Sequence, residues 1–275
     1  MLAFANLSKS PVSVDLAIDA LLAQRWNSLM FELDTKTLAD SRVQLHLAAQ
    51  LIGGSADALL ERAADDSHAN IGWQATSSEL VGRTKVSISL EDLTVRYIGD
   101  AFALQGATLD EAVDWLSSKI GAGVGFRGYD GMPEHDISRG AAISIPPAAL
   151  SVMADCFSLA QRALSGNGEL RIWPHHFDMG FWQPSQHEGK SVGGGFSLGD
   201  NHYDGPYFYM NPYGVERPQT LPPLKHGHWS EHWFGAVLTA AELQQAATTH
   251  SLPNEQFAAE FVTESRSICD NLITG

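Results

Sequence analysis

The sequence predicts an α+β protein in which antiparallel strands are flanked by helices. In some segments apolar residues recur at spacings of three and four, which indicates helices, and in others they alternate with polar residues, which indicates strands. The strand segments follow one another in runs, whereas a parallel sheet would alternate them singly with helices. With 44% hydrophobic and 18% charged residues, the chain of 275 residues has a globular composition. We expect a single compact unit over residues 1–275.

The first half of the chain predicts two helices followed by two strands. The helical spacing is strong in the second of these helices and weaker in the first, and the two strands alternate with period two as an antiparallel pair does. In order along the chain, these elements are residues 14–29, 41–63, 86–90 and 93–97. Thr108 and Glu111 then have the T-x-x-E spacing of a capping box, and Gly121 is suited to end the helix that they begin.

The second half repeats this order after a glycine-rich segment, residues 121–140, which predicts a loop or a linker. The elements expected there are a helix over residues 147–166, strand segments over residues 170–182, 192–198 and 207–210, and a final helix over residues 257–272. Between the last strand segment and the final helix, Thr239 and Glu242 repeat the capping-box spacing and predict another helix.

The repeated order suggests an internal duplication of residues 38–122 and 145–272. At an offset of 108, residues 68–92 match residues 176–200 at six of 25 positions, where composition alone gives about one or two. A duplication would make two similar lobes related by a twofold axis, with a ligand site where they meet. The alternative is that the chemistry of strands and turns recurs by itself.

The charge balance excludes one class of partner. The formal net charge is -15, with 17 basic and 32 acidic side chains and no basic cluster, so we expect no nucleic-acid binding. Residues 1–10 lack the pattern of a signal peptide, and no apolar run is long enough to span a membrane, so neither is expected. Cys156 and Cys269 lie in helical patterns, which favours buried reduced thiols and a cytoplasmic protein.

Histidines and a carboxylate gather after residue 172. The segment W-P-H-H-F-D contains His175, His176 and Asp178, and seven of the 11 histidines lie between residues 175 and 232. In a continuous strand, His176 and Asp178 would share one face and His175 would take the other. His176 and Asp178 could then bind a divalent metal, or form a base with its orienting carboxylate. Alternatively, these polar groups hydrogen-bond one another at the end of a strand.

Three further patterns carry weaker hypotheses. A helix over the segment of His226, His228 and His232 would bring metal ligands together, although Gly227 favours an irregular aromatic loop. Ser197 lies in G-F-S-L-G, the spacing of a hydrolase nucleophile elbow, but the residues after it favour a turn over the required helix. Aromatic residues alternate along the later strands, which suits either a small-molecule pocket or core packing.

The segments W-P-H-H-F-D, G-F-S-L-G-D and P-Y-F-Y-M-N-P resemble those of a bacterial family of uncharacterised proteins, a domain of unknown function. The resemblance extends over about residues 26–272 and implies a shared fold and polar site without a reaction. Its motifs fall on His46, His68, His175, Asp178 and Asp200. This match favours His175, whereas the repeat offset pairs His176 with His68, so both histidines stay candidates.

The sequence thus predicts one candidate site for a small ligand or a divalent metal, with hydrolysis left open. Its residues are His46, His68, His175, His176, Asp178 and Asp200, of which His176 and Asp178 are the metal candidates. A non-catalytic protein-interaction module and a serine hydrolase using Ser197 are the alternatives. The sequence does not indicate an oligomeric state.

Overall fold

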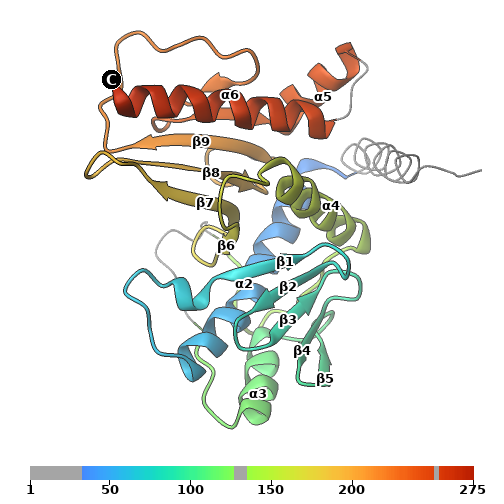
Figure 1. Cartoon of the computed structure of the whole chain (residues 1–275). Coiled ribbons are helices and arrows are strands. Elements are labelled where there is room, and N and C mark those ends of the chain that lie inside the picture. Colours follow the sequence, from blue (N-terminus) through green and yellow to red (C-terminus); the bar gives the residue numbers. More distant parts are fainter. Residues whose placement is uncertain (1–32, 127–134, 251–253) are drawn as a thin grey trace, which may run out of the picture.

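The computed structural model describes residues 33–126, 135–250 and 254–275 (Figure 1). The helix predicted over residues 14–29 and part of the glycine-rich segment lie outside the described residues. Within the described ranges the chain forms helices and one antiparallel sheet, so the predicted α+β class is confirmed.

The described strands form a single sheet of eleven in the order β10-β11-β9-β8-β7-β6-β1-β2-β3-β4-β5. Their bounds are β1 Ile71–Gln74, β2 Glu79–Gly82, β3 Val86–Ser89, β4 Thr94–Tyr97, β5 Asp100–Ala103, β6 Arg171–Trp173, β7 Asp178–Pro184, β8 Ser191–Ser197, β9 Tyr207–Tyr213, β10 His228–Trp229 and β11 Ala236–Thr239. The antiparallel pair expected over residues 86–97 is present as β3 and β4.

The bounds of the helices are α2 Thr35–Leu59, α3 Leu109–Ile120, α4 Pro147–Ala163, α5 Ala240–His250 and α6 Asn254–Thr274, with a short 3-10 turn at Ser67–Ala69. Helices α3 and α4 begin close to their predicted positions because the signals at their ends are local, whereas α2 begins six residues before the predicted start at residue 41 and ends four residues before the predicted end at residue 63. Thr108 and Glu111 form the expected capping box of α3, and Gly121 ends that helix in the left-handed conformation. Thr239 and Glu242 make the same reciprocal bonds at the start of α5.

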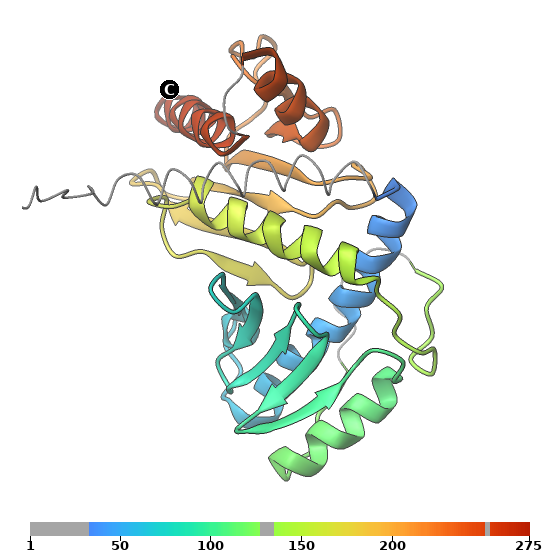
Figure 2. The same cartoon turned by 90° about the vertical axis from the view of Figure 1, so that its right-hand side faces the viewer.

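Helices cover one face of the second group of strands, β6 to β11. Helix α6 packs on β8 and β9, and α4 packs on β7 and β8 (Figure 2). The side chains buried beneath them are Met179, Phe181, Phe196, Phe208 and Met210. Helix α2 runs from this group toward β2 and β3 in the first group, so one apolar core connects both groups (Figure 1).

The two groups of strands join at a single pair of residues, Ile71 of β1 and Ile172 of β6. The offset of 108 is inconsistent with this sheet. It aligns β1 with β7 and β3 with β8, yet β7 and β8 are neighbours while β2 separates β1 from β3. The matching residues at that offset therefore do not occupy equivalent strands, and the duplication is not shown.

The segment predicted as one strand over residues 170–182 is two strands joined by a tight turn. Strands β6 and β7 pair antiparallel, with Trp173 opposite Asp178, so His175 and His176 lie in the turn. Phe177 has a φ of 55° there, in the left-handed region that reverses the chain. The predicted placing of the two histidines on opposite strand faces is therefore wrong.

Two further features agree with the sequence. Cys156 in α4 and Cys269 in α6 are buried and unbridged, as predicted. Among the described residues, none of the helices combines the length and the apolar character needed to cross a bilayer.

Candidate functional site

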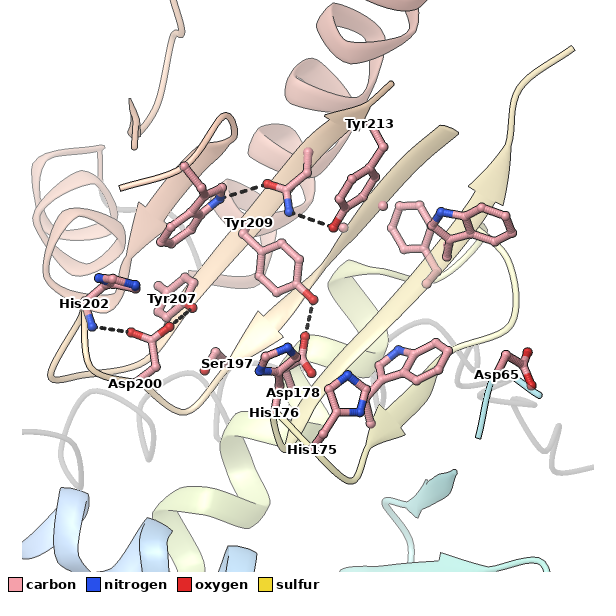
Figure 3. Close-up of a pocket in the computed structure, with 17 residues that line it drawn as sticks. Asp65, His175, His176, Asp178, Ser197, Asp200, His202, Tyr207, Tyr209 and Tyr213 are labelled. Carbon is pink, nitrogen blue, oxygen red and sulfur yellow. Dashed lines mark hydrogen bonds between the residues drawn. The ribbon is translucent and has the colours of Figure 1, made fainter. Parts of the chain in front are cut away.

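A cavity of about 800 Å³ opens on the face of β7, β8 and β9 opposite to α4 and α6 (Figure 3). We call it the aromatic pocket. It is lined by Asp65, Trp173, His175, His176, Asp178, Phe181, Trp182, Gly193, Gly194, Ser197, Asp200, His202, Tyr207, Tyr209, Asn211, Tyr213 and Trp233. Strands of the second half supply most of this lining, and Asp65 comes from the segment after α2.

Strand register places the tyrosines of β9 on the pocket face. Tyr207, Tyr209, Asn211 and Tyr213 face the pocket and alternate with Phe208, Met210 and Pro212, which point into the helix-covered core, because side chains alternate along a strand. Directly paired residues share a face. The pairing of Tyr209 with Gly195, and of Gly195 with Gly180, therefore puts two glycines beside the Tyr209 ring.

These glycines let the Tyr209 ring lie flat across the sheet. A Cβ on Gly195 would come within 2.6 Å of the Tyr209 hydroxyl, and one on Gly180 within 3.0 Å. With no side chains there, Tyr209 crosses two strands and donates a hydrogen bond to Asp178 Oδ2 at the start of β7 (Figure 3). The glycine-rich composition of β8 thus serves to place one phenol on one carboxyl.

Asp178 is the buried acid of the pocket. The residue is only 8% exposed to solvent. Its Oδ1 atom has no hydrogen-bond partner among the described residues. Burial raises the pKa of this carboxyl above its ordinary value, while the hydrogen bond from Tyr209 and the nearby His176 and His175 oppose the shift. Asp178 therefore has one buried carboxyl oxygen without a hydrogen bond, in a low-dielectric site.

The turn between β6 and β7 brings both histidines to the pocket. The rings of His175 and His176 have centroids 4.5 Å apart, and that of Trp173 lies 5.9 Å from that of His175. Burial lowers the pKa of His175, and the neighbouring His176 adds to this effect, which favours the neutral imidazole. The sequence left open which of the two histidines faces the site, and in the structure both line the same cavity.

Buried contacts behind the turn fix its conformation. Phe177, which carries the left-handed backbone, stacks on His46 with ring centroids 5.0 Å apart and meets Phe157 edge-on. His46 Nε2 donates to the Pro174 carbonyl at 2.6 Å, and Gln50 donates to the same oxygen at 3.0 Å. Helix α2 thus holds the turn whose histidines line the pocket.

Two sequence-predicted residues lie outside the pocket. His46 is buried behind the turn, where burial lowers its pKa to about 4, so the ring is a neutral donor at neutral pH. His68 is buried beside α2, with Nε2 2.8 Å from Asp57 Oδ1 and Nδ1 accepting the Ala63 N–H. Both histidines make structural contacts and do not reach the cavity.

Asp200 lines the pocket but all its bonds serve the loop before β9. Oδ1 accepts the backbone N–H groups of His202 and Tyr203, and Oδ2 accepts the Tyr207 hydroxyl at 2.6 Å. The buried guanidinium of Arg42 lies beneath this loop and interacts with the Asp200 charge. The negative charge of Asp200 is therefore stabilised by hydrogen bonds and by Arg42, whereas Asp178 has one oxygen without a hydrogen-bond partner.

Ser197 has the environment of a turn and not that of a nucleophile elbow. Its Oγ accepts the Gly199 N–H at 3.1 Å and lies 3.2 Å from the Gly199 carbonyl oxygen. Strand β8 ends at Ser197, and the next element is β9, so the helix required after a nucleophile elbow is absent.

The later histidines do not form a metal cluster. His228 Nδ1 is 2.9 Å from Glu242, and His232 stacks on His202 with ring centroids 4.5 Å apart. The segment of His226, His228 and His232 is irregular around the short β10, as the glycine suggested. In the described ranges, no three groups of the His, Cys, Asp or Glu type are arranged to hold a metal ion, so His176 and Asp178 lack a third ligand.

The aromatic alternation along the later strands suggested a pocket, but the predicted site residues left out the side chains on β9 and its neighbours that line it. They include Tyr207, Tyr209, Asn211, Tyr213 and Trp233. The signal was present in Y-F-Y-M-N-P-Y, where every second residue is a tyrosine or an asparagine, together with the three consecutive glycines of β8. Pairing the two patterns would have predicted aromatic rings lying over glycines.

Comparisons with known proteins found no matching family model, curated protein or solved structure. The resemblance to a bacterial family of uncharacterised proteins stays a prediction.

Proposed function

We propose that this protein binds a small organic molecule in the aromatic pocket, against the Asp178 carboxyl. The observation that carries the proposal is a buried acid with one unpartnered oxygen in a cavity of about 800 Å³. Cavities of roughly 300–1,000 Å³ with aromatic walls and a few polar groups are typical of small-molecule sites.

The polar groups of the pocket favour an organic ligand over a metal ion. A metal held by His176 and Asp178 alone would lack the three or more protein ligands that zinc sites normally supply. An organic molecule needs only a few hydrogen bonds together with apolar contact, and the aromatic walls offer that contact.

A screen of small aromatic fragments by ligand-observed NMR tests the proposal. Trp182 is 59% exposed at the pocket, so Trp182→Ala should fold normally and weaken fragment binding. Ile98→Ala is the matched control, because Ile98 is 67% exposed outside the pocket lining. Fragments that bind wild type and both variants equally, or no fragment binding at all, would contradict the proposal.

A protein-interaction role is the second candidate, favoured by the exposure of Trp182 and of Tyr213, which is 45% exposed. In that case, substituting His175 and Asp178 together leaves partner capture unchanged while Trp182→Ala abolishes it. Loss of capture in the His175 and Asp178 double variant would count against this role.

We also propose that the two halves of the chain arose by duplication, in a register other than the offset of 108. Strands β1 and β6 each follow a long helix, and they are antiparallel neighbours at the junction of the two groups, as strands related by a twofold axis would be. This supports equivalence of β1 with β6.

A further inference from the structure

We infer that the ligand of the aromatic pocket is a protonated amine with at least one N–H, on a flat apolar body. The inference rests on the proposed function and names its ligand class. It follows from three observations: acidic side chains line the pocket, the buried acid Asp178 has an oxygen without a hydrogen bond, and the walls are aromatic.

The pocket is acidic. Its lining contains Asp65, Asp178 and Asp200, whereas no lysine or arginine is among the described residues that line it. The whole chain carries a formal charge of -15, which adds to the negative potential around the opening. An anionic ligand would be repelled by these carboxylates, and a cation would be attracted.

Of the three acids, only Asp178 needs a partner from outside. Asp200 accepts three hydrogen bonds and has Arg42 beneath its loop. Asp65 accepts the Ser67 N–H and is exposed to solvent. Asp178 is 8% exposed, and its Oδ1 is unpartnered. Burying an ionised carboxylate without a cation is costly, so a cationic ligand gains most at this position.

The free oxygen also selects among cations. After a shift of the side chains that cover the buried Oδ1, an ammonium group with at least one N–H can donate to this oxygen while Tyr209 keeps its bond to Oδ2. A quaternary ammonium has no hydrogen to donate and would leave Oδ1 unsatisfied. The arrangement therefore favours a protonated amine that carries at least one N–H over a quaternary ammonium.

The walls fit the rest of such a ligand. The faces of Trp173, Trp182, Tyr209 and Tyr213 offer apolar contact and can attract a cation through their π electrons. Asn211 holds two of the rings in place, since it accepts from Trp233 Nε1 at 3.0 Å and donates to the Tyr213 hydroxyl at 3.1 Å. Two rings of the walls are thus held in place before a ligand binds.

Amine binding should strengthen as pH rises through the pKa of Asp178. The amine itself stays protonated up to a pH of about 10, so the change comes from the protein. The groups that face Asp178 are His175 and His176 from the turn and Tyr209 and Tyr207 from β9.

Three indoles of matched shape test the ligand class by isothermal titration calorimetry: tryptamine is a cation, tryptophol is neutral and indole-3-acetate is an anion. We expect wild type to bind tryptamine roughly 10- to 100-fold more tightly than tryptophol, and indole-3-acetate most weakly. Asp178→Asn should remove the preference for tryptamine. Asp114→Asn, which changes an exposed acid of α3, should keep it.

The outcomes separate the inference from the proposed function. If tryptophol binds as tightly as tryptamine, the ligand class is wrong and pocket binding stands. If no indole binds up to about 10 mM while the fragment screen yields other pocket ligands, the inference also fails and the proposed function survives. If neither experiment detects binding, both fall. The comparison of the three indoles needs only the wild-type protein, so it still tests the ligand class if Asp178→Asn does not fold.

Discussion

Replacing Gly195 with alanine should disrupt the pocket, because the Tyr209 ring occupies the space that the new methyl group would need. A Cβ at this position would lie 2.5 Å from the Met179 carbonyl oxygen, 2.6 Å from the Tyr209 hydroxyl and 2.8 Å from Tyr209 Cζ. These distances are below ordinary van der Waals contact. One neighbour is backbone within a paired strand and cannot move far, so the Tyr209 ring must shift.

The size of the effect follows from two terms. Overpacking by a methyl group costs about 1–3 kcal/mol. Moving Tyr209 also takes its hydroxyl from Asp178 and leaves a buried carboxyl unsatisfied, which costs about 1–3 kcal/mol. The two terms share one displacement and are not additive, so we expect the free energy of unfolding to fall by about 2–4 kcal/mol.

Urea unfolding followed by tryptophan fluorescence measures this loss. Gly72→Ala is the matched control, because Gly72 also lies in a strand, β1, and its new Cβ would be 3.6 Å from the nearest atom, the Val81 carbonyl oxygen. We expect that control to stay within about 1 kcal/mol of wild type. A loss in Gly195→Ala no larger than in the control would refute the account of Tyr209 lying across glycines.

Two further predictions concern the buried residues around the pocket. Burial raises the pKa of Asp178, so its contribution to stability is fully present below the ordinary carboxyl pKa and is lost as pH rises through the raised value. The free energy of unfolding of Asp178→Asn should therefore decline less than that of wild type between about pH 4 and pH 8, and parallel curves would contradict this. Phe177→Ala should lose about 3–5 kcal/mol in urea unfolding, because it empties a buried site behind the turn. Phe102→Ala, which changes a partly buried ring of β5, should lose less, and equal losses would argue against the role of Phe177.

The parts of the fold that the sequence predicted have signals within a few residues. Thr108, Glu111 and Gly121 predicted both ends of α3 because capping depends on neighbouring residues. Strands β1, β2 and β5 were not predicted, although they have four residues each, as β3 and β4 do, because glycine and alanine make their alternation of apolar and polar residues unclear. Most of their pairings are with the next strand along the chain, whereas the pairing of β1 with β6 joins segments that are distant in the sequence.

The candidate site was predictable where its members are close in the chain. His175, His176 and Asp178 fall within four positions, and all line the cavity. His46 and His68 were chosen because motifs of the resembled family fall on them, and a motif does not distinguish a ligand from a buried structural donor. That distinction depends on burial and on partners such as the Pro174 carbonyl and Asp57. The bond from Tyr209 to Asp178 depends on the register of β7, β8 and β9.

The position of Asp178 is determined from both faces of the sheet. On the pocket face, Tyr209 reaches it across Gly195 and Gly180. On the opposite side, Phe177 keeps a left-handed backbone because its ring is buried against His46 and Phe157. Left-handed backbone at a bulky residue costs about 1–3 kcal/mol and persists only where packing enforces it. The carboxyl is thus held in place before a ligand binds, at a cost in stability that a cationic partner at Oδ1 would offset.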